Sequence, residues 1–132
     1  MIGILDVSGA VEILLQKEKA SKFSKVFLET AVVAAPDLYV SELTNTFWRY
    51  YTANILSDKE CFEHVQTGIK FISKFINSRE LWQEAFSEGI KNKYSIYDMF
   101  YMVTTRRYSG VLITNDSALA AVCRKNHVEV CF

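Results

Sequence analysis

Short apolar runs alternate along the chain with longer segments in which apolar residues recur every three or four positions. The runs predict buried strands, and the periodic segments predict helices. The strands are predicted at residues 2–5, 31–34, 111–114 and 128–131. The helices are predicted from Ser8 through Leu15, over Ala20–Glu29, after Pro36, over about Asp58–Ile76, and over Arg79–Lys91, Ser95–Arg107 and Ser117–Lys125.

Strands that alternate with helices are typical of an α/β fold built around a parallel sheet. The two long helical patterns at 58–76 and 79–91 predict a helical hairpin between the second and third strands. No repeat, linker or low-complexity segment interrupts the pattern, and 132 residues suffice for one hydrophobic core. We therefore expect a single domain over residues 1–132.

The helix after Pro36 separates its residues by face. Asp37 is the expected N-cap of this helix. One stripe is apolar and the other polar, and they consist of Tyr39, Leu43, Phe47 and Tyr50, and of Glu42, Asn45 and Arg49. The remaining aromatics exceed what one face can bury. We expect Trp48 and Tyr51 to form an exposed patch for a partner, with base stacking as the weaker alternative.

Composition limits the classes of function. Lysine plus arginine and aspartate plus glutamate number 15 each, so a local arrangement of charge would have to bind any nucleic acid. Three cysteines without C-x-x-C spacing indicate a reducing compartment. The N-terminal apolar run meets Asp6 too early for a signal peptide, and no run approaches the roughly 18 residues of a membrane span. We expect a cytoplasmic protein with no membrane association.

Four carboxylates interrupt apolar sequence, where a charge is expensive: Asp6, Glu42, Asp98 and Asp116. Asp6 and Asp116 follow predicted strands, at the sheet edge where α/β proteins bind ligands. Clustered acids raise their own pKa values unless cations neutralise them. Oxygen ligands without nearby histidine or cysteine favour Mg²⁺ or Mn²⁺, and His64 and His127 lack ligand spacing.

Each acid also has an ordinary structural interpretation. Asp6 and Asp116 are suited to cap the helices that follow them. Ser95 and Asp98 have the spacing of a capping box, and Glu42 fits a solvated helix face. The common location of the four acids, rather than any one of them, predicts a functional site.

The ordered set of motifs around these acids resembles the four motifs of PIN-domain nucleases. The set consists of Asp6-Val7-Ser8, Glu42-Leu43-Thr44-Asn45, Tyr97-Asp98, and Thr114-Asn115-Asp116 followed by Leu119. It covers essentially the whole chain, whose size and layout are similar to the VapC toxins of bacterial toxin–antitoxin pairs. The resemblance implies a three-layer PIN-like fold, with a central parallel sheet of four to five strands flanked by helices and a helical hairpin insertion.

The resemblance also implies the roles of the residues. The four acids would be catalytic and bind Mg²⁺ or Mn²⁺, with Asp6 and Asp98 as inner ligands, and one or two ions would activate water to hydrolyse RNA. Ser8, Asn45 and Thr114 match supporting polar positions. The segment at 99–103, Met-Phe-Tyr-Met-Val, is bulky where members of the family often carry small alanines.

Partners follow from the same resemblance: an RNA substrate, a cognate antitoxin and a second copy of the chain in a homodimer. An antitoxin segment would lie between the early helices and the hairpin, with a basic side chain reaching the acids. Arg49, Lys91 and Lys93 are the expected RNA contacts. Four other cations at helix C-termini are expected to be surface charge: Arg106, Arg107, Arg124 and Lys125.

Three alternatives stay open at this point. A catalytically idle PIN-like module would bind RNA or a partner through the same pocket. A housekeeping RNA-processing nuclease would share the chemistry but need no antitoxin. A receiver-like phosphotransfer domain would need a lysine after a late strand, where this chain has Thr114-Asn115-Asp116.

Overall fold

The computed structural model describes residues 1–132, which form five strands and seven helices. The strands are β1 (Ile2–Leu5), β2 (Val32–Pro36), β3 (Lys74–Ile76), β4 (Val111–Ile113) and β5 (Val130–Cys131). They form one sheet in the order β3-β2-β1-β4-β5, and every neighbouring pair is parallel. The predicted α/β fold with a central parallel sheet is therefore confirmed, with five strands.

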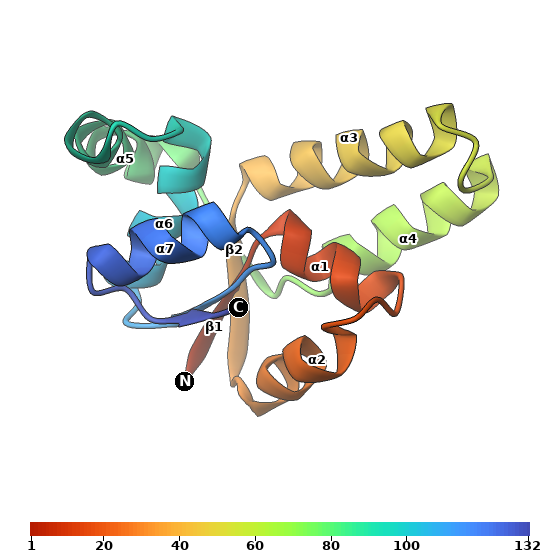
Figure 1. The fold of residues 1–132 in the computed structure, drawn as a ribbon, viewed down its shortest axis with the longest axis horizontal. Helices are drawn as coiled ribbons and strands as arrows, with labels where there is room; N and C mark the ends of the chain where they lie inside the picture. The colour runs from red at the N-terminus through yellow and green to blue at the C-terminus, as the bar shows by residue number, and fades with distance from the viewer.

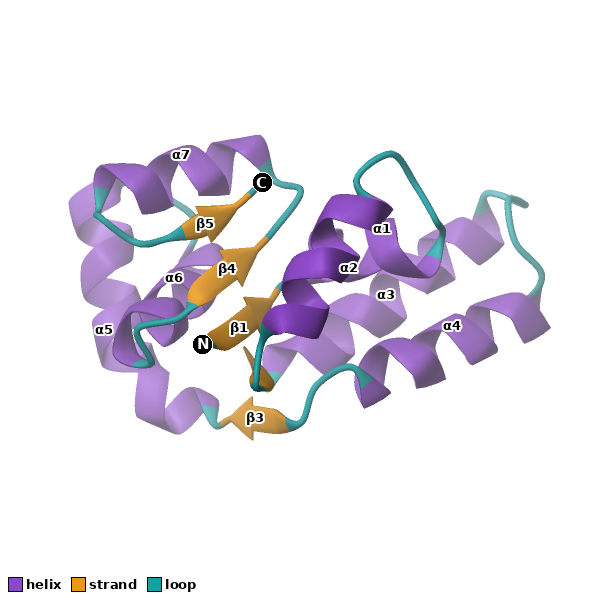
Figure 2. Cartoon of the chain, turned by 90° about the horizontal axis from the view of Figure 1, so that it is seen from below, coloured by secondary structure: helices purple, strands orange, loops and turns teal.

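Helices cover the sheet on two sides and make three layers. They are α1 (Val7–Leu14), α2 (Ala20–Glu29), α3 (Leu38–Thr52), α4 (Asp58–Lys70), α5 (Ser78–Asn92), α6 (Ile96–Arg107) and α7 (Ser117–Lys125). Helices α5, α6 and α7 lie on one side of the strands, and α1 to α4 lie on the other (Figures 1 and 2). None of the helices combines the length and the apolar character that crossing a membrane requires.

The core lies between the central strands and the helices on both sides. Ile4 and Leu5 of β1 and Leu112 and Ile113 of β4 are fully buried, as expected for strands covered on both faces. Helix α6 packs against β1, β2 and β4. Burial of each of the four strand side chains contributes about 1.5–3 kcal/mol to the free energy of folding.

The register of the two central strands positions the site. Leu5 of β1 pairs with Ile113 of β4, so the two strands end at the same level. The next residues, Asp6 and Thr114, therefore leave the sheet side by side, and the amide of Asp6 donates to the carbonyl of Ile113 (3.2 Å).

The helical hairpin predicted over residues 58–91 is wrong, because the two helices do not pair and a strand separates them. Helix α4 ends at Lys70, the edge strand β3 follows, and α5 lies on the opposite side of the sheet. The helix that pairs with α4 is α3, and the two run side by side away from the sheet (Figure 1). A strand of three residues is too short to produce an alternating pattern that competes with helical periodicity.

Asp37 occupies the predicted N-cap position of α3, but its side chain does not cap the helix. Asp37 has helical backbone angles and its side chain caps nothing in α3. Its carboxylate instead accepts hydrogen bonds from the amide (3.2 Å) and the hydroxyl of Ser78, at the start of α5. Strand β2 correspondingly runs on through Pro36, whereas we predicted its end at residue 34.

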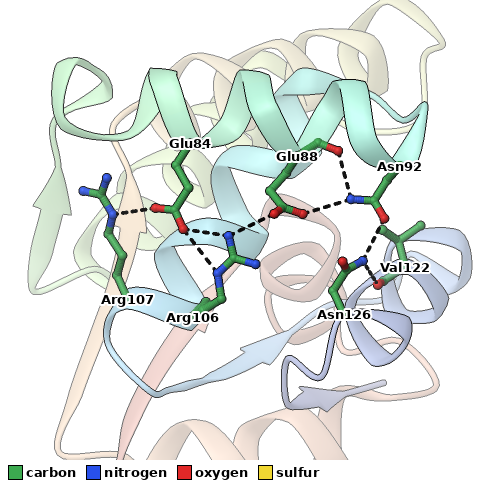
Figure 3. A network of polar contacts seen from close by, with 7 residues as sticks. All are labelled: Glu84, Glu88, Asn92, Arg106, Arg107, Val122 and Asn126. Carbon is green, nitrogen blue, oxygen red and sulfur yellow. Dashed lines mark hydrogen bonds and ion pairs between the residues drawn. The ribbon is translucent and has the colours of Figure 1, made fainter.

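A polar network joins α5 to α6 and α7 (Figure 3). Glu84 accepts from Arg106 (2.7 Å) and from Arg107 (2.8 Å), and Glu88 accepts from Arg106 (3.2 Å). Asn92 donates to Glu88 (3.0 Å) and accepts from Asn126 (2.9 Å). Both arginines therefore link α6 to α5, a more specific structural role than the surface charge that we expected.

Candidate active site

All four predicted acids line one cleft of about 480 Å³ at the carboxyl ends of the strands. Asp6 follows β1, Glu42 lies in α3, Asp98 lies in the first turn of α6, and Asp116 precedes α7. Four separate elements thus bring their carboxylates to one place, at the edge where parallel sheets bind ligands.

Asp6 is the most buried of these acids, and its carboxylate accepts three hydrogen bonds. Its Oδ1 accepts from the hydroxyl of Ser8 (2.7 Å) and from the amide of Gly9 (2.8 Å), and its Oδ2 accepts from the hydroxyl of Thr114. The bond from Gly9 caps helix α1. Asp6 is therefore an N-cap and a cleft residue at once, and the two interpretations are compatible.

The hydroxyls of Ser8 and Thr114 link the ends of β1 and β4. The Ser8 oxygen also accepts from the amide of Asn115 (2.8 Å), and the Thr114 oxygen accepts from the amide of Asp116 (3.0 Å). The two hydroxyl oxygens lie 3.1 Å apart. Each hydroxyl has a single proton, and both protons point to Asp6. While Asp6 is ionised, therefore, no proton lies between the two hydroxyl oxygens.

Asp116 and Asp98 differ in how they are held. Oδ1 of Asp116 accepts from the amide of Leu119 (3.0 Å) and caps α7, which leaves Oδ2 without a protein partner. Asp98 has no hydrogen bond to its carboxylate, and Ser95 makes no side-chain cap, so the predicted capping box is absent. The carboxylate of Asp98 is thus the least restrained in the cleft.

Glu42 reaches across the cleft toward α6. Its Oε1 accepts a hydrogen bond from the hydroxyl of Tyr101 (2.6 Å). Burial raises the pKa of Tyr101 well above its ordinary value, and the neighbouring Glu42 carboxylate adds to the effect, so the phenol stays protonated and donates. Sequence reasoning missed this contact because the two residues lie 59 positions apart.

The acids disfavour one another's charge. Burial, and secondarily the nearby Asp116, raise the pKa of Asp6 to about 6 despite its three hydrogen bonds. Burial, then Asp116 and Asp6, raise the pKa of Asp98 to about 6. Burial and Asp98 raise the pKa of Glu42, which the bond from Tyr101 opposes. This is the electrostatic condition that a cation relieves.

The donor set fits a hard cation that retains water. Every candidate ligand in the cleft is a carboxylate or another oxygen group, which suits Mg²⁺ or Mn²⁺. No three acidic, histidine or cysteine side chains come close enough together to enclose an ion directly. Mg²⁺ commonly binds through one or two carboxylates and keeps several waters. The wide spacing of these acids therefore suits Mg²⁺ better than a site in which the protein supplies every ligand would.

The other predicted site residues divide into two groups. Ser8 and Thr114 hold Asp6, while Asn45 and Arg49 line the cleft with side chains that make no hydrogen bond. Lys91 and Lys93 are exposed around the end of α5 and do not line the cleft.

Two charged cleft residues escaped the sequence analysis. Lys17 lies at the rim and donates to the hydroxyl of Tyr50 (3.0 Å). Glu12 is buried, lines the cleft and accepts from the amide of Lys19 (3.3 Å). The apolar neighbours Val11 and Ile13 were the available signal for Glu12, the same signal that marked the four other acids.

A second, apolar groove lies between α3 and α4, away from the acids. Its volume is about 510 Å³. Trp48 and Tyr51, which we expected to be exposed, line it and are 59% and 50% exposed, and Phe62 on the facing helix is 80% exposed. The exposed patch predicted from the aromatic excess is therefore present.

No protein-family model and no curated protein matches the chain. Solved structures share its fold. PAE2754 from Pyrobaculum aerophilum matches with a TM-score of 0.74 at 16% identity, over 92% of this chain and 87% of that chain. A chain of VapBC2 from Rickettsia felis, bound to a DNA fragment from their promoter, matches with a TM-score of 0.69 at 11% identity, over 99% and 98%. The chain therefore shares the fold of these two structures, and the VapBC2 match agrees with the fold that the motif resemblance implied.

Proposed function

We propose that the chain is a Mg²⁺- or Mn²⁺-dependent endoribonuclease that acts as the toxin of a type II toxin–antitoxin pair. The observation that carries the nuclease is the convergence of Asp6, Glu42, Asp98 and Asp116, from four elements, on one cleft of a PIN-type fold.

Each acid has its own part in this proposal. Asp98, whose carboxylate has no hydrogen bond, and Asp6, whose carboxylate is rigidly held, would be the inner ligands, while Asp116 and Glu42 would complete the shell through water. When bound, the ion lowers the pKa of a water molecule and neutralises charge on the scissile phosphate. Arg49 and Lys17 supply positive charge at the rim to position the RNA backbone.

The toxin assignment rests on the match to a VapBC2 chain over nearly the full length of both chains and on two exposed apolar faces. We assign the groove at Trp48, Tyr51 and Phe62 to an apolar segment of the antitoxin. We assign the stripe of Trp82, Phe86 and Ile90 on α5, at four-residue spacing and more than half exposed, to the homodimer contact.

The nuclease is tested by Asp98→Asn, with Glu129→Gln as the matched control. Both changes remove one charge, but Glu129 is exposed and lies outside the cleft. Asp98→Asn should lower Mn²⁺-dependent RNA cleavage at least a hundredfold while the protein stays folded, and Glu129→Gln should cleave like wild type. Cleavage by Asp98→Asn at the wild-type rate, or full activity in EDTA, would falsify the assignment.

The toxin role needs a separate test, because a housekeeping nuclease has the same cleft. The chain is expressed alone and together with its neighbouring gene product in one host. Growth arrest that the second protein relieves is the expected result. Equal growth in both cases, with the lone protein active on RNA in vitro, would instead indicate a housekeeping nuclease.

A further inference from the structure

Tyr101 links α6 to α3 across the cleft. It lies in α6 three residues after Asp98, so both side chains are on neighbouring positions of one helix face. Its ring is buried with only 2% exposed, and its hydroxyl donates to Oε1 of Glu42 on α3 at 2.6 Å. No other hydrogen bond holds the Glu42 side chain.

This bond determines how Glu42 can present its charge. Glutamate is a long, flexible side chain, and here it is half-buried beside Asp98, whose charge repels it. A phenol that donates to a carboxylate makes a strong, short hydrogen bond and fixes the direction of the carboxyl group. Because Oε1 is engaged, Oε2 is the oxygen that remains free of protein partners.

We infer that Tyr101 is a positioning residue that fixes Glu42 relative to Asp98 across the cleft and leaves Glu42 a single free oxygen for a divalent cation or its water. The inference rests on the proposed metal-dependent function. It also assigns a purpose to the bulky segment at 99–103, since an alanine at position 101 could not reach α3.

Mn²⁺ affinity tests the inference without measuring cleavage. Tyr101→Phe removes the hydroxyl and keeps the ring. Tyr39→Phe is the matched control, because Tyr39 is equally buried and its hydroxyl donates to the carbonyl of Gly68 (2.8 Å) instead of to an acid. Loss of a hydrogen bond that orients a ligand typically weakens metal binding about tenfold or more. We expect that loss for Tyr101→Phe and less than a twofold change for Tyr39→Phe, and equal affinity of the two variants overturns the inference.

A double-mutant cycle on the metal-free protein separates this inference from the proposed function. Tyr101→Phe, Glu42→Ala and the double variant are unfolded in urea. If Tyr101 holds Glu42, the two changes are non-additive, and the unfolding constants differ from additivity by a factor of about ten. Additive effects overturn the inference even if the wild type binds Mn²⁺. A wild type that binds no Mn²⁺ contradicts the proposed function, and the cycle then still decides whether Tyr101 positions Glu42.

Discussion

Asp6 and Asp98 have the same raised pKa of about 6 but sit in opposite surroundings. Asp6 is buried and receives three hydrogen bonds that favour its charge, yet desolvation outweighs them. Asp98 is only partly buried and receives none. Burial is the main cause of both raised pKa values, but the two carboxylates would serve a cation in different ways: Asp6 offers a fixed position, and Asp98 offers a carboxylate without protein partners.

The raised pKa values predict an unusual dependence of stability on pH. Both acids titrate near 3.8 when unfolded and at about 6 when folded, so the folded protein holds protons that the unfolded chain releases. The free energy of unfolding of the metal-free protein should therefore fall as pH rises from about 4 to about 6. For the buried Asp6, a shift of this size corresponds to about 3 kcal/mol. Urea unfolding in EDTA across this range measures it.

Asp98→Asn is the informative variant for this prediction, because it removes a titrating group without removing a hydrogen bond. It should flatten the pH dependence, and saturating Mn²⁺ should flatten it in the wild type. If the free energy of unfolding of the metal-free wild type instead rises with pH over this interval, folding does not disfavour the ionised form of these carboxyl groups.

At the residue scale the sequence predicted which acids matter but not how they are held. Asp6 and Asp98 could be identified because a buried carboxylate has apolar neighbours in the sequence. The contact between Tyr101 and Glu42 leaves no such trace, because it depends on the distance between α3 and α6. The same reasoning applies to Lys17, whose place at the rim depends on how the chain turns after α1.

At the scale of elements, the prediction succeeded where periodicity was sustained. The bounds predicted for α2 and α7 agree with the structure. Strand β3 was missed because its three residues lie at the sheet edge, where Lys74 and Phe75 are exposed and only Ile76 is buried. Tertiary pairing with β2, rather than local preference, decides its conformation.

The contact between α1 and β4 depends on a glycine. A Cβ on Gly9 would lie 2.6 Å from the carbonyl oxygen of Ile113, and a backbone atom cannot move aside cheaply. Gly9→Ala should therefore destabilise the protein by about 2–3 kcal/mol. Gly68→Ala is the control, since its Cβ would meet a side-chain carbon of Leu43 at 2.7 Å, and a side chain can turn away. Urea unfolding should show a clearly smaller loss for Gly68→Ala, and equal losses would contradict the argument.

At the scale of the whole molecule, two apolar faces predict two separable partners. If the chain is the proposed homodimer, replacing Phe86 and Ile90 on α5 by serine should convert it to a monomer in sedimentation velocity, because we assign the contact to these residues. Phe62→Ser, on the other apolar face, should leave the dimer intact. If the dimer survives the α5 change and dissociates with Phe62→Ser, the two assignments are reversed, and the groove between α3 and α4 forms the dimer contact.

The balance of charge over the molecule predicts weak, local attraction of RNA. The net charge is zero, and the three salt bridges engage only Arg106 and Arg107 among the cations. Arg49→Ala should weaken RNA binding and reduce the slope of log affinity against log salt by about 1. Lys91→Ala, outside the cleft, should leave the slope unchanged. The opposite result would place the RNA path along the end of α5 and restore the sequence prediction for Lys91.

The paired hydroxyls of Ser8 and Thr114 would let Asp6 exchange a proton for the proposed cation without rearranging the protein. When Asp6 takes up a proton on Oδ2, that group donates to Thr114, the hydroxyl of Thr114 turns toward the Ser8 oxygen 3.1 Å away, and every partner stays satisfied. Only hydrogen atoms move between the two states. The ends of β1 and β4 would therefore form a preorganised site, in which binding and release of the proposed cation would cost little reorganisation energy.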